Sequence, residues 1–511
     1  MNRVRRRLVL AIDQGTTSTR CITFDPSGQI AHSSFSEFPQ LYPQPGWVEH
    51  DVEDIYRSLV SCVNALKLNP SVDEVAAIGI TNQRETVVAW DRYTGKPFHN
   101  AIVWMDTRTQ DLVAKQVADG GVNRFRHITG LPISTYFSAL KLKWLISNVP
   151  SIRDGLDKNR CCFGTIDSYL TWRLTGGTVH VTDCANASRY NLMDLREQEW
   201  SEQICNELGI PMNALPTIVS NSEKVGVVSD PLLPSLTGVP ITALIGDQHA
   251  ALLGHGCTSN HEAKITYGTG CFLLMNTGMS PVGSKSGALV TTIGYKLGKK
   301  SEPVFALEGS VAAAGRAVQW AKENLRIGSD LQEFNEIASS VPDTCGVTFV
   351  PAFSGLFAPY WRTDARGVIV GMSLRASYRH IARAILESAA IQCAQVVDLL
   401  KRDCEIEKLP TIVTDGGMTK SSLLMQIQSD LLNAVVKRAR MSEATAFGAA
   451  YCAGLHVGFW EGRSVKEISA GQSGYDEFRP AMTEDARKAA FDRWEDAVKR
   501  SFDLSKFAPA E

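Results

Sequence analysis

The sequence predicts a mixed α/β protein made of two related domains. Its 511 residues exceed what a single hydrophobic core usually fills, so two domains of roughly 250 residues each are expected. In the first half, strand-like apolar runs alternate with helical segments, and polar clusters follow the strands, where open sheets of this kind bind ligands. A strand-turn-strand pattern at 8–24 recurs at 264–278. Such a repeat indicates a duplicated α/β fold whose domains face each other.

The first of these two patterns is a hairpin with a polar tip. Leu8 to Ile12 form an apolar strand that stops at Asp13, residues 15–18 (Gly-Thr-Thr-Ser) form the turn, and residues 21–24 resume an extended run. Backbone N–H groups and hydroxyls at such a tip can bind phosphate oxygens, and Asp13 can hold Mg2+ directly or through its water. A polar turn also occurs without any ligand, so the functional interpretation depends on what accompanies it.

The other elements follow ordinary helix and strand periodicities. Helices are predicted at 52–68, 136–147, 199–209 and 379–402, with a last helix that starts near Thr483. Apolar strands are predicted at 75–80, 241–245 and 409–413. Residues 86–90 are expected to pair with the strand at 75–80. The last helix carries Phe491, Trp494, Val498 and Phe502 on one face, which favours core packing over a partner site.

Composition argues against several classes of partner. The formal net charge of −2 disfavours nucleic acid. The apolar run near the N-terminus is too short for a signal peptide or a membrane span, and the chain does not end in a Ser-Lys-Leu address. The twelve cysteines lack metal-binding spacing, which favours buried, inert thiols in a reducing compartment. We therefore expect an intracellular, cytoplasmic protein, with an organelle left open.

Three acids lie at the ends of predicted strands, namely Asp13, Asp247 and Asp415. The first two are followed by Gln14 and Gln248. A carboxylate at a strand end is often only a cap, but three of them beside two Gly-Thr hairpins favour a functional site. No Walker A, G-x-G-x-x-G, H-E-x-x-H or G-x-S-x-G motif occurs in a fitting context, so these acids carry the prediction.

A series of short stretches carries a resemblance to a known family. The stretches are AIDQGTTSTR, ITNQRET, TGLPISTYFSALKLKWL, FGTIDSYL, NASR, GDQHAAL, YGTGCF, ALEGS, VPAFSGLFAPYW, ARG, DGG and ATAFGAAYCAGL. From about residue 8 to about residue 460, the chain resembles the glycerol kinases of the FGGY group of carbohydrate kinases. The resemblance implies two duplicated ribonuclease-H-like domains of the actin and hexokinase type, at residues 1–255 and 256–511. ATP and glycerol would meet in a catalytic cleft between them.

The resemblance also implies residue roles. Asp247 and Asp13 would be catalytic, with Asp247 as general base and Asp13 as the residue that organises Mg2+. The glycerol-binding set would be Arg84, Glu85, Trp104, Tyr136, Asp247, Gln248 and Phe272. The set for phosphates and nucleotide would be Thr16, Thr17, Ser18, Arg20, Gly268, Thr269, Gly315, Gln319, Gly417, Met418 and Ser421. The implied reaction is ATP-dependent phosphorylation of glycerol to sn-glycerol 3-phosphate, with domain closure, in a homodimer.

Some positions depart from the usual text of that family. The departures are Ile265 and Ser421 in place of Asn, Arg362 in place of Asp, Arg316 in place of a small residue, and Cys184-Ala185 in place of Val-Thr. They put the nucleotide contacts in doubt and leave the glycerol set intact.

Alternatives remain open at the level of single residues and of the whole chain. Arg84 and Glu85 could be a surface ion pair, Trp104 and Tyr136 ordinary core aromatics, and Asp247 a strand-end cap. The chain could also be a related kinase for another polyol or a ketose. From a different class, it could be an actin-type nucleotide-binding protein or a regulator without catalysis.

Overall fold

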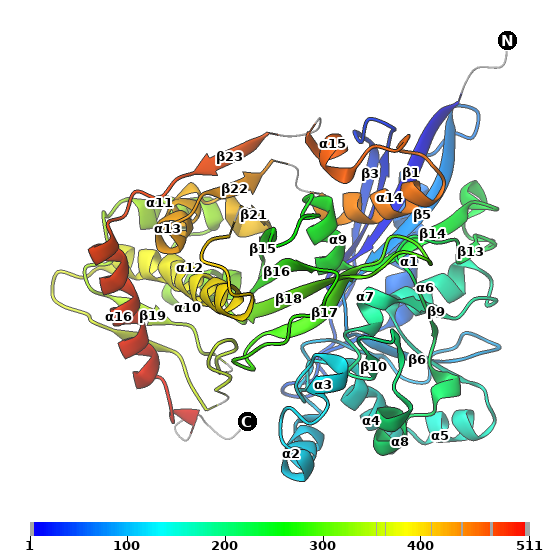
Figure 1. Cartoon of the computed structure of the whole chain (residues 1–511), viewed down its shortest axis with the longest axis horizontal. Helices are drawn as coiled ribbons and strands as arrows, with labels where there is room; N and C mark the ends of the chain where they lie inside the picture. The colour runs from blue at the N-terminus through cyan, green and yellow to red at the C-terminus, as the bar shows by residue number, and fades with distance from the viewer. Residues whose placement is uncertain are drawn as a thin grey trace.

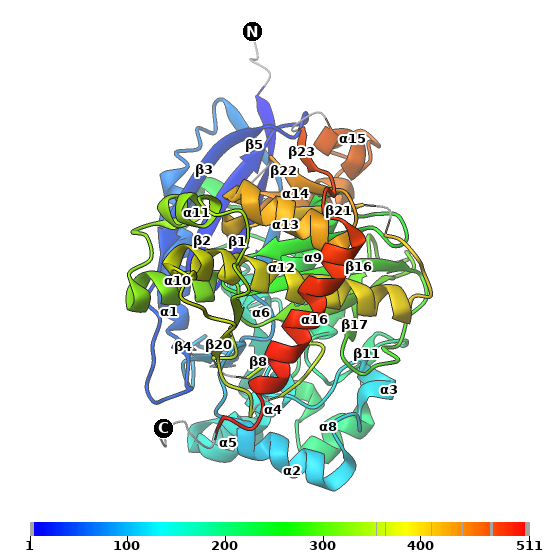
Figure 2. The ribbon, with the colours of Figure 1, turned by 90° about the vertical axis from the view of Figure 1, so that its left-hand side faces the viewer.

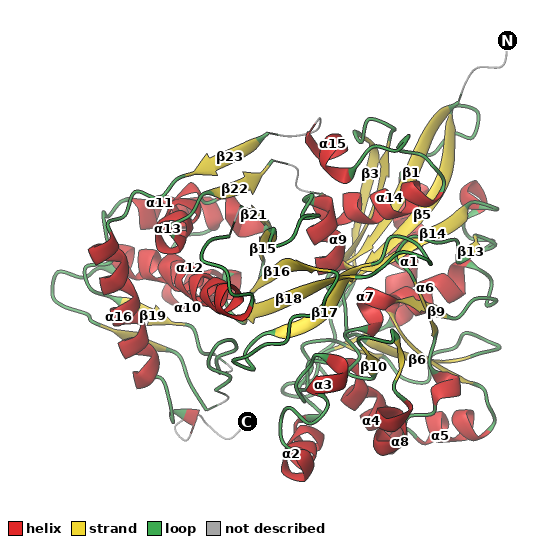
Figure 3. Ribbon diagram, viewed as in Figure 1, coloured by secondary structure: helices red, strands yellow, loops and turns green. Residues whose placement is uncertain are grey.

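The computed structural model of the chain describes residues 5–353, 355–362, 364–409, 411–440, 443–470 and 474–505. Two halves follow each other along the chain, and each is built on a large mixed sheet (Figures 1 and 3). Across the first sheet the strands are β13 (Gly226–Val227), β14 (Pro240–Gly246), β5 (Asp73–Asn82), β1 (Arg6–Gln14), β2 (Ser18–Phe24) and β3 (Ile30–Glu37). Across the second they are β17 (Val290–Tyr295), β18 (Val304–Val311), β16 (Cys271–Gly278), β15 (Ala263–Tyr267), β21 (Ile412–Asp415), β22 (Val436–Ala439) and β23 (Tyr475–Phe478).

The two large sheets share one pattern of strand directions. In the first, β1 is antiparallel to β2 and parallel to β5, β5 is parallel to β14, and β13 closes the edge antiparallel. In the second, β15 is antiparallel to β16 and parallel to β21, β21 is parallel to β22, and β23 closes the edge antiparallel. This correspondence confirms the predicted duplication, with the hairpin β1–β2 matching the hairpin β15–β16.

Smaller sheets and helices complete the two halves. Four strands form a separate sheet, β4 (Glu49–His50), β7 (Ala101–Ile102), β6 (Val87–Asp91) and β8 (Cys161–Thr165). The short pairs are β10 (Met193–Asp194) with β11 (Glu199–Trp200), β12 (Thr217–Val219) with β9 (Val181–Asp183), and β19 (Thr348–Val350) with β20 (Val368–Val370). The helices are α1 (Val52–Ala65), α2 (Gln110–Gly120), α3 (Arg126–Thr129), α4 (Ser138–Asn148), α5 (Pro150–Asp157), α6 (Ile166–Leu174), α7 (Cys184–Ala187), α8 (Glu202–Leu208), α9 (Asp247–Gly254), α10 (Gly315–Leu325), α11 (Leu331–Ser339), α12 (Tyr378–Asp403), α13 (Ser422–Leu432), α14 (Ala444–His456), α15 (Val465–Ala470) and α16 (Glu484–Arg500). Single 3-10 turns are η1 (Met212–Ala214), η2 (Pro234–Leu236) and η3 (Gly417–Lys420).

The predicted pairing of residues 86–90 with the strand at 75–80 is wrong. Residues 87–91 form β6, which pairs with β7 and β8 in the four-stranded sheet. The strand β5 is flanked on both sides by parallel strands, β1 and β14, so it has no free edge for β6. Glu85, with a φ of 58°, lies in the connection where the chain leaves the large sheet.

The two halves are joined by a close helix crossing. Helix α9 follows β14, and its counterpart α14 follows β22; the two pack against each other and α14 also covers β5 and β1 (Figure 1). A Cβ atom at Gly254 would collide with the carbonyl of Ala444, and one at Gly448 would collide with the carbonyl of Ala250. The absence of side chains at these glycines lets the two backbones touch. A segment of the C-terminal half therefore covers the sheet of the N-terminal half.

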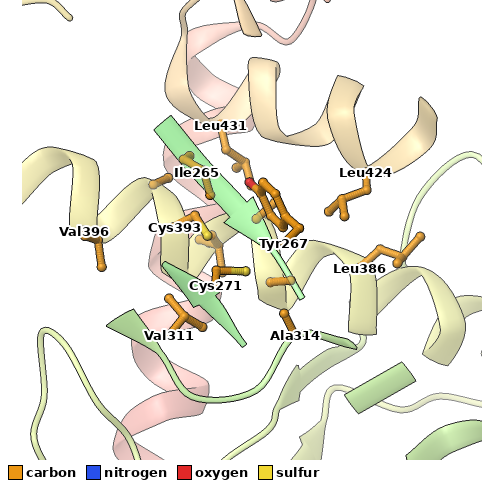
Figure 4. Close-up of a cluster of buried hydrophobic side chains, with 14 of the residues drawn as sticks. Ile265, Tyr267, Cys271, Val311, Ala314, Leu386, Cys393, Val396, Leu424 and Leu431 are labelled. Carbon is orange, nitrogen blue, oxygen red and sulfur yellow. The ribbon is translucent and has the colours of Figure 1, made fainter. Parts of the chain in front are cut away.

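The core of the C-terminal half lies between its sheet and the helices α12 and α13 (Figure 4). Ile265, Tyr267 and Cys271 come from the hairpin strands and lie near Cys393 of α12 and Leu424 of α13. Ile265 is fully buried in this cluster, so this departure from the family text is a core residue. All twelve cysteines of the chain carry free thiols, as predicted.

The last helix, α16, crosses the outer face of the C-terminal half (Figure 2). It begins after Thr483, whose hydroxyl caps it by accepting the N–H of Ala486 at 3.3 Å. Trp494 and Val498 are buried in the core, and Phe491 packs against it, which confirms the predicted packing role. Among the helices that the structure describes, none combines the length and the apolar character needed to cross a membrane.

Candidate active site

Two of the predicted acids meet at one edge of the N-terminal sheet. Because β1, β5 and β14 are parallel, their carboxyl ends lie together, with Asp13 opposite Thr81 and Gly246 opposite Asn82. Asp247 follows Gly246 directly and is the first residue of α9. Its charge contributes to raising the pKa of Asp13, so the two carboxyl groups act on each other.

Asp13 is a carboxylate with little charge compensation. Burial raises its pKa from 3.8 to about 7, with Arg20 opposing the rise and Asp247 and Glu443 adding to it. Arg20 forms an ion pair with Glu443 at 3.2 Å, so its charge is shared. A hard cation at Asp13 would favour the ionised form and relieve the repulsion from Asp247.

Next to Asp247 lies a buried cluster of four charged side chains, which we call the charge cluster: Arg84, Glu85, Arg189 and Glu308. Arg84 donates from Nη1 and Nη2 to the two oxygens of Glu308 at 2.6 and 3.0 Å. Arg189 donates from Nε to Glu85 Oε1 at 2.6 Å and from Nη2 to Glu308 Oε1 at 3.3 Å. None of the four is more than 3% exposed, so the interpretation of Arg84 and Glu85 as a surface ion pair is wrong.

The electrostatics of the charge cluster follow from its composition. Burial raises the pKa of Glu308, but Arg189 and Arg84 outweigh it and hold that pKa at about 2. Arg84 Nε lies 3.4 Å from Asp247 Oδ1, which connects the cluster to the predicted base. Burial raises the pKa of Asp247, and Arg84 opposes this rise. The carboxyl group of Asp247 is therefore a better proton acceptor than an exposed aspartate.

Three aromatic rings form a wall beside the charge cluster. Trp104 meets Tyr136 edge to face at 5.6 Å between ring centroids and Phe272 at 6.0 Å. Phe272 comes from the C-terminal half, on β16, so the wall spans both halves. The guanidinium of Arg189 lies 5.4 Å from the centroid of Tyr136. These three rings, called the aromatic wall below, are only partly buried and are not closed core aromatics.

Gln248 is oriented by a lysine from the other half. The ammonium of Lys264 donates to Gln248 Oε1 and to Thr266 Oγ1, the latter at 2.7 Å. Since the amide oxygen is occupied, the NH2 group of Gln248 is left to donate elsewhere. Burial lowers the pKa of Lys264 to about 8, although Asp415 and Asp247 oppose this effect. Asp415, the third predicted acid, pairs instead with His255 Nε2 at 2.8 Å and helps to join the two halves.

The N-terminal hairpin presents donors at its tip. The turn is closed by the N–H of Gly15, which donates to the carbonyl of Ser18 at 2.9 Å. Thr16 accepts a hydrogen bond from Trp104 Nε1 at 3.1 Å, and Thr17 is exposed. Within the described part of the chain, no acceptor is found for the N–H groups of Thr16 and Thr17. Free amides at a turn are the groups that bind phosphate oxygens.

The C-terminal hairpin contacts the start of α10. The carbonyl of Gly268 accepts the N–H of Gly315 at 3.0 Å, and the carbonyl of Thr269 accepts the N–H groups of Ala314 and Arg316 at 2.9 and 3.0 Å. A Cβ atom at Gly315 would lie 2.6 Å from the Gly268 carbonyl oxygen and 3.3 Å from Met418 Sδ. The structure therefore brings together four members of the predicted nucleotide set, Gly268, Thr269, Gly315 and Met418.

Other members of that set have different surroundings. Gly416 has a φ of 95° and packs on the backbone of Tyr267, whereas a Cβ atom at Gly417 would meet nothing within 4 Å. Ser421 is buried and caps α13 by accepting the N–H of Leu424 at 3.1 Å. Gln319 is exposed on α10 and donates to Glu323. Gly417 therefore has free space beside its Cα atom, whereas the hydroxyl of Ser421 already accepts a hydrogen bond from the first turn of α13.

The remaining departures lie in ordinary structural contacts. Arg362 donates to Asp364 at 2.6 Å and pairs with Asp503 at 3.3 Å, with its guanidinium 4.2 Å from the Phe502 ring centroid. Arg316 is exposed. Cys184 is buried and donates to Asn221 Oδ1 at 3.4 Å.

Three site residues were missed by the sequence reasoning: Glu308, Arg189 and Lys264. Glu308 lies within the quoted stretch ALEGS and Arg189 within NASR, yet neither was given a role. The available signal was a single charged residue inside an apolar strand, as in β18 and β15, because such a charge requires a buried partner.

Comparisons with known proteins place the chain in a family. It matches the model of the FGGY family of carbohydrate kinases in two parts, the N-terminal domain at residues 8–254 and the C-terminal domain at residues 263–457. A glycerol kinase of Nocardia farcinica is 48% identical over 505 residues, covering 97% of this chain and 99% of that relative. A glycerol kinase of Brucella anthropi is 48% identical over 496 residues, covering 96% and 98%.

A solved structure of a relative supports the same family assignment. The crystal structure of Plasmodium falciparum glycerol kinase with ADP superposes with a TM-score of 0.90 and 41% identity, covering 97% of this chain and 98% of that one. Duplicated sheets, two Gly-Thr hairpins and acids at the strand ends define a two-domain kinase of the actin and hexokinase type. The chain belongs to the FGGY family of carbohydrate kinases.

Proposed function

We propose that this protein catalyses the ATP-dependent phosphorylation of glycerol to sn-glycerol 3-phosphate. The observation that carries the proposal is the charge cluster beside Asp247, bounded by the aromatic wall, because it offers buried polar partners to a small polyol. Relatives about equal in length, named glycerol kinases, support the same substrate.

Recognition of glycerol depends on its hydroxyl groups. Arg84, Glu85 and Gln248 are proposed to hydrogen-bond them, and an analogue that lacks a hydroxyl would leave a buried polar group unpaired. The guanidinium of Arg84 is fixed by its hydrogen bonds to Glu308, and the amide of Gln248 is fixed by the hydrogen bond from Lys264. These groups are fixed before the substrate arrives, so little entropy is lost when it binds. The aromatic wall covers the carbon edge of the substrate.

The chemical step transfers the γ-phosphoryl group. We infer that Asp247 accepts the proton of the attacking primary hydroxyl while the oxygen forms its bond to phosphorus and ADP leaves with the bridging oxygen. The raised pKa of Asp247 suits this role. General base catalysis contributes about 10²- to 10⁴-fold, so the rest of the acceleration comes from positioning and hydrogen bonds around the transferring group. Closure of the two halves would exclude water as a rival acceptor.

Asp13 fits the role of a magnesium ligand. Its carboxylate is partly buried, has a raised pKa and is next to a second acid, conditions that a divalent cation relieves. The described residues contain no cluster of three or more potential metal-ligating side chains. Asp13 would hold Mg2+ directly or through its water. When bound, Mg2+ supplies charge neutralisation to the phosphates.

The nucleotide is proposed to lie between the two hairpins. Thr16, Thr17, Ser18 and Arg20 would contact the phosphates from the N-terminal half. Gly268, Thr269, Gly315, Gln319, Gly417 and Met418 would line the nucleotide in the C-terminal half. Ser421 is also proposed to line the nucleotide, although a contact through its hydroxyl competes with its capping bond to Leu424.

Three further properties are proposed. The domains divide near residues 255 and 256, between α9 and β15. The protein is a homodimer, which light scattering can test. The twelve free thiols fit a reducing compartment, so we propose the cytoplasm, which fractionation can test.

A substrate panel tests the proposed function. Initial rates with ATP and Mg2+ would be measured for glycerol, dihydroxyacetone, erythritol and xylulose by coupling ADP formation to NADH oxidation. We expect the highest kcat/KM for glycerol. Efficient turnover of the pentulose without turnover of glycerol would establish the alternative ketose kinase. Binding of ADP with no phosphorylated product from any acceptor would establish the non-catalytic alternative.

A further inference from the structure

Each backbone carbonyl at the tip of the N-terminal hairpin, residues 15–17, accepts a hydrogen bond from another part of the protein. The carbonyl of Gly15 accepts from Gln83 Nε2 at 3.0 Å and from Gln14 Nε2 at 2.6 Å, and Gln40 Nε2 donates to the carbonyl of Thr16 at 3.0 Å. The carbonyl of Thr17 accepts the N–H of Phe38 at 3.2 Å. A peptide unit whose carbonyl is fixed on one side must present the next N–H on the other side. The N–H groups of Thr16 and Thr17, which are proposed to bind phosphate, are therefore oriented by side chains that do not contact the ligand.

A buried histidine connects the two glutamines. His50 Nε2 lies 2.6 Å from Gln40 Oε1, and His50 Nδ1 lies 3.4 Å from Gln83 Nε2. An amide oxygen only accepts and an amide nitrogen only donates, so this pair of contacts selects the neutral ring with its hydrogen on Nε2. His50 is fully buried and packs edge to face on Phe38 at 5.2 Å. Its burial lowers its pKa to about 4, which keeps it neutral in ordinary buffers.

The hydrogen bonds continue from Gln83 to Trp104 of the aromatic wall. Gln83 Oε1 accepts from Thr86 Oγ1 at 2.9 Å, and Thr86 Oγ1 accepts the N–H of Trp104 at 3.1 Å. Trp104 then donates from its ring Nε1 to Thr16 Oγ1 at 3.1 Å, back at the hairpin tip. The hydrogen bonds thus form a closed ring through the phosphate hairpin and the tryptophan of the acceptor side.

We propose that Gln40, His50 and Gln83 form a positioning triad that fixes the phosphate-binding amides of the N-terminal hairpin, and that Thr86 extends this fixation to Trp104. The inference rests on the proposed function, because it assigns the triad to the ATP phosphates of that reaction. The three residues touch neither ATP nor glycerol in this account, and they act through Gly15 and Thr16. Loss of one member should weaken phosphate binding while the fold remains intact.

The test compares variants with an apolar side chain in place of glutamine, together with a matched control. Gln40→Leu removes the donor to the Thr16 carbonyl and the acceptor of His50 Nε2. Gln83→Leu removes one donor to the Gly15 carbonyl, the amide nitrogen that faces His50 Nδ1 and the acceptor of Thr86, and leaves Gln14 as the other donor to Gly15. Gln426→Leu is the control, because Gln426, like Gln40, is a partly buried glutamine that donates to a backbone carbonyl, that of Arg479 at 2.9 Å, remote from the hairpin. Each variant is examined by thermal unfolding, by calorimetric titration with Mg-ADP and by steady-state kinetics.

We expect Gln40→Leu and Gln83→Leu each to weaken Mg-ADP binding and to raise the KM for ATP about 3- to 10-fold, the effect of one lost hydrogen bond. The KM for glycerol should change less than about 2-fold in Gln40→Leu, since the contacts of Gln40 go to Thr16, Phe38 and His50 and not to the aromatic wall, while Thr86→Val should raise both KM values. The double variant should lose less than the product of the two single losses, because both act through His50. Gln426→Leu should leave Mg-ADP binding unchanged.

A spectroscopic readout separates positioning from mere stability. In 15N-labelled protein, His50 should show a protonated Nε2 and an unprotonated Nδ1, identified by the loss of this signal in His50→Gln, and the pattern should change in both glutamine variants. Unchanged Mg-ADP binding in both variants, or equal losses in Gln426→Leu, would overturn the inference. Failure of the wild-type protein to phosphorylate glycerol would instead overturn the proposed function, and the Mg-ADP titration would still decide on the triad.

Discussion

Glu308 holds two buried arginines in place, so its neutralisation is expected to be costly. The variant Glu308→Gln keeps the shape of the side chain and removes its charge. Glu308, Arg84 and Arg189 have side chains at most 2% exposed, so water cannot replace the lost charge. Removing one partner of a buried ion pair costs about 3–5 kcal/mol. The charge cluster should therefore lose a large part of its stabilising effect.

The pKa of Glu308 gives a second value for the same quantity. It is lowered from 4.5 to about 2, and each unit of pKa corresponds to about 1.4 kcal/mol, which gives about 3 kcal/mol. Because the folded pKa lies below the unfolded one, this stabilisation is complete above pH 4.5 and is lost as the pH falls toward about 2. The two routes agree on a loss of about 3 kcal/mol at pH 7.

Urea unfolding at pH 7 and at decreasing pH measures this loss. The free energy of unfolding of Glu308→Gln should be about 3 kcal/mol below that of the wild type at pH 7, and the difference should shrink below pH 4.5. The control Asp154→Asn breaks an exposed pair with Lys158 and should cost less than about 1 kcal/mol. A loss below about 1 kcal/mol for Glu308→Gln, or one that does not depend on pH, would refute the reasoning.

Three further predictions concern other parts of the site. The pKa of Asp13 is raised from 3.8 to about 7, so the ligand-free protein should lose stability as the pH rises through this range, and Asp13→Asn should remove that part of the slope in urea unfolding; an unchanged slope would contradict the assignment. Lys264→Met frees the amide of Gln248 to rotate and should raise the KM for glycerol about 10-fold in the coupled assay, with a smaller change for ATP; equal changes in both would count against it. Gly417→Ala should fold normally and raise the KM for ATP, whereas its neighbour Gly416→Ala should lower the melting temperature, because only Gly416 has a positive φ and no space for a Cβ atom. A lowered melting temperature in Gly417→Ala would show that the position is not open.

Local patterns made much of the fold predictable. The two hairpins follow from short apolar runs separated by small polar residues, and both appear where the sequence places them. The pairing of residues 86–90 was wrong because pairing depends on which edges of a strand are free, and β5 has none. Strand partners far apart in the sequence leave no local signal.

The sequence allowed the residues of the candidate site to be predicted, but not most of the hydrogen bonds and ion pairs that connect them. Arg84, Glu85 and Asp247 are recognisable from motifs, and the structure brings them together. The support of Arg84, Glu308, comes from a strand of the other half, and no local pattern relates residues more than 200 positions apart, as Arg84 and Glu308 are. Ser421 illustrates the opposite case, because a hydroxyl expected at the nucleotide caps a helix instead.

In the proposed mechanism, phosphoryl transfer to glycerol depends on Asp247 as the proton acceptor. This dependence is tested most directly by Asp247→Asn, with kcat measured in the coupled assay and glycerol binding measured by calorimetry. The variant keeps the size of the side chain and removes its ability to take a proton. We expect a fall in kcat of at least about 10²-fold with glycerol binding largely retained. Turnover close to that of the wild type would contradict it.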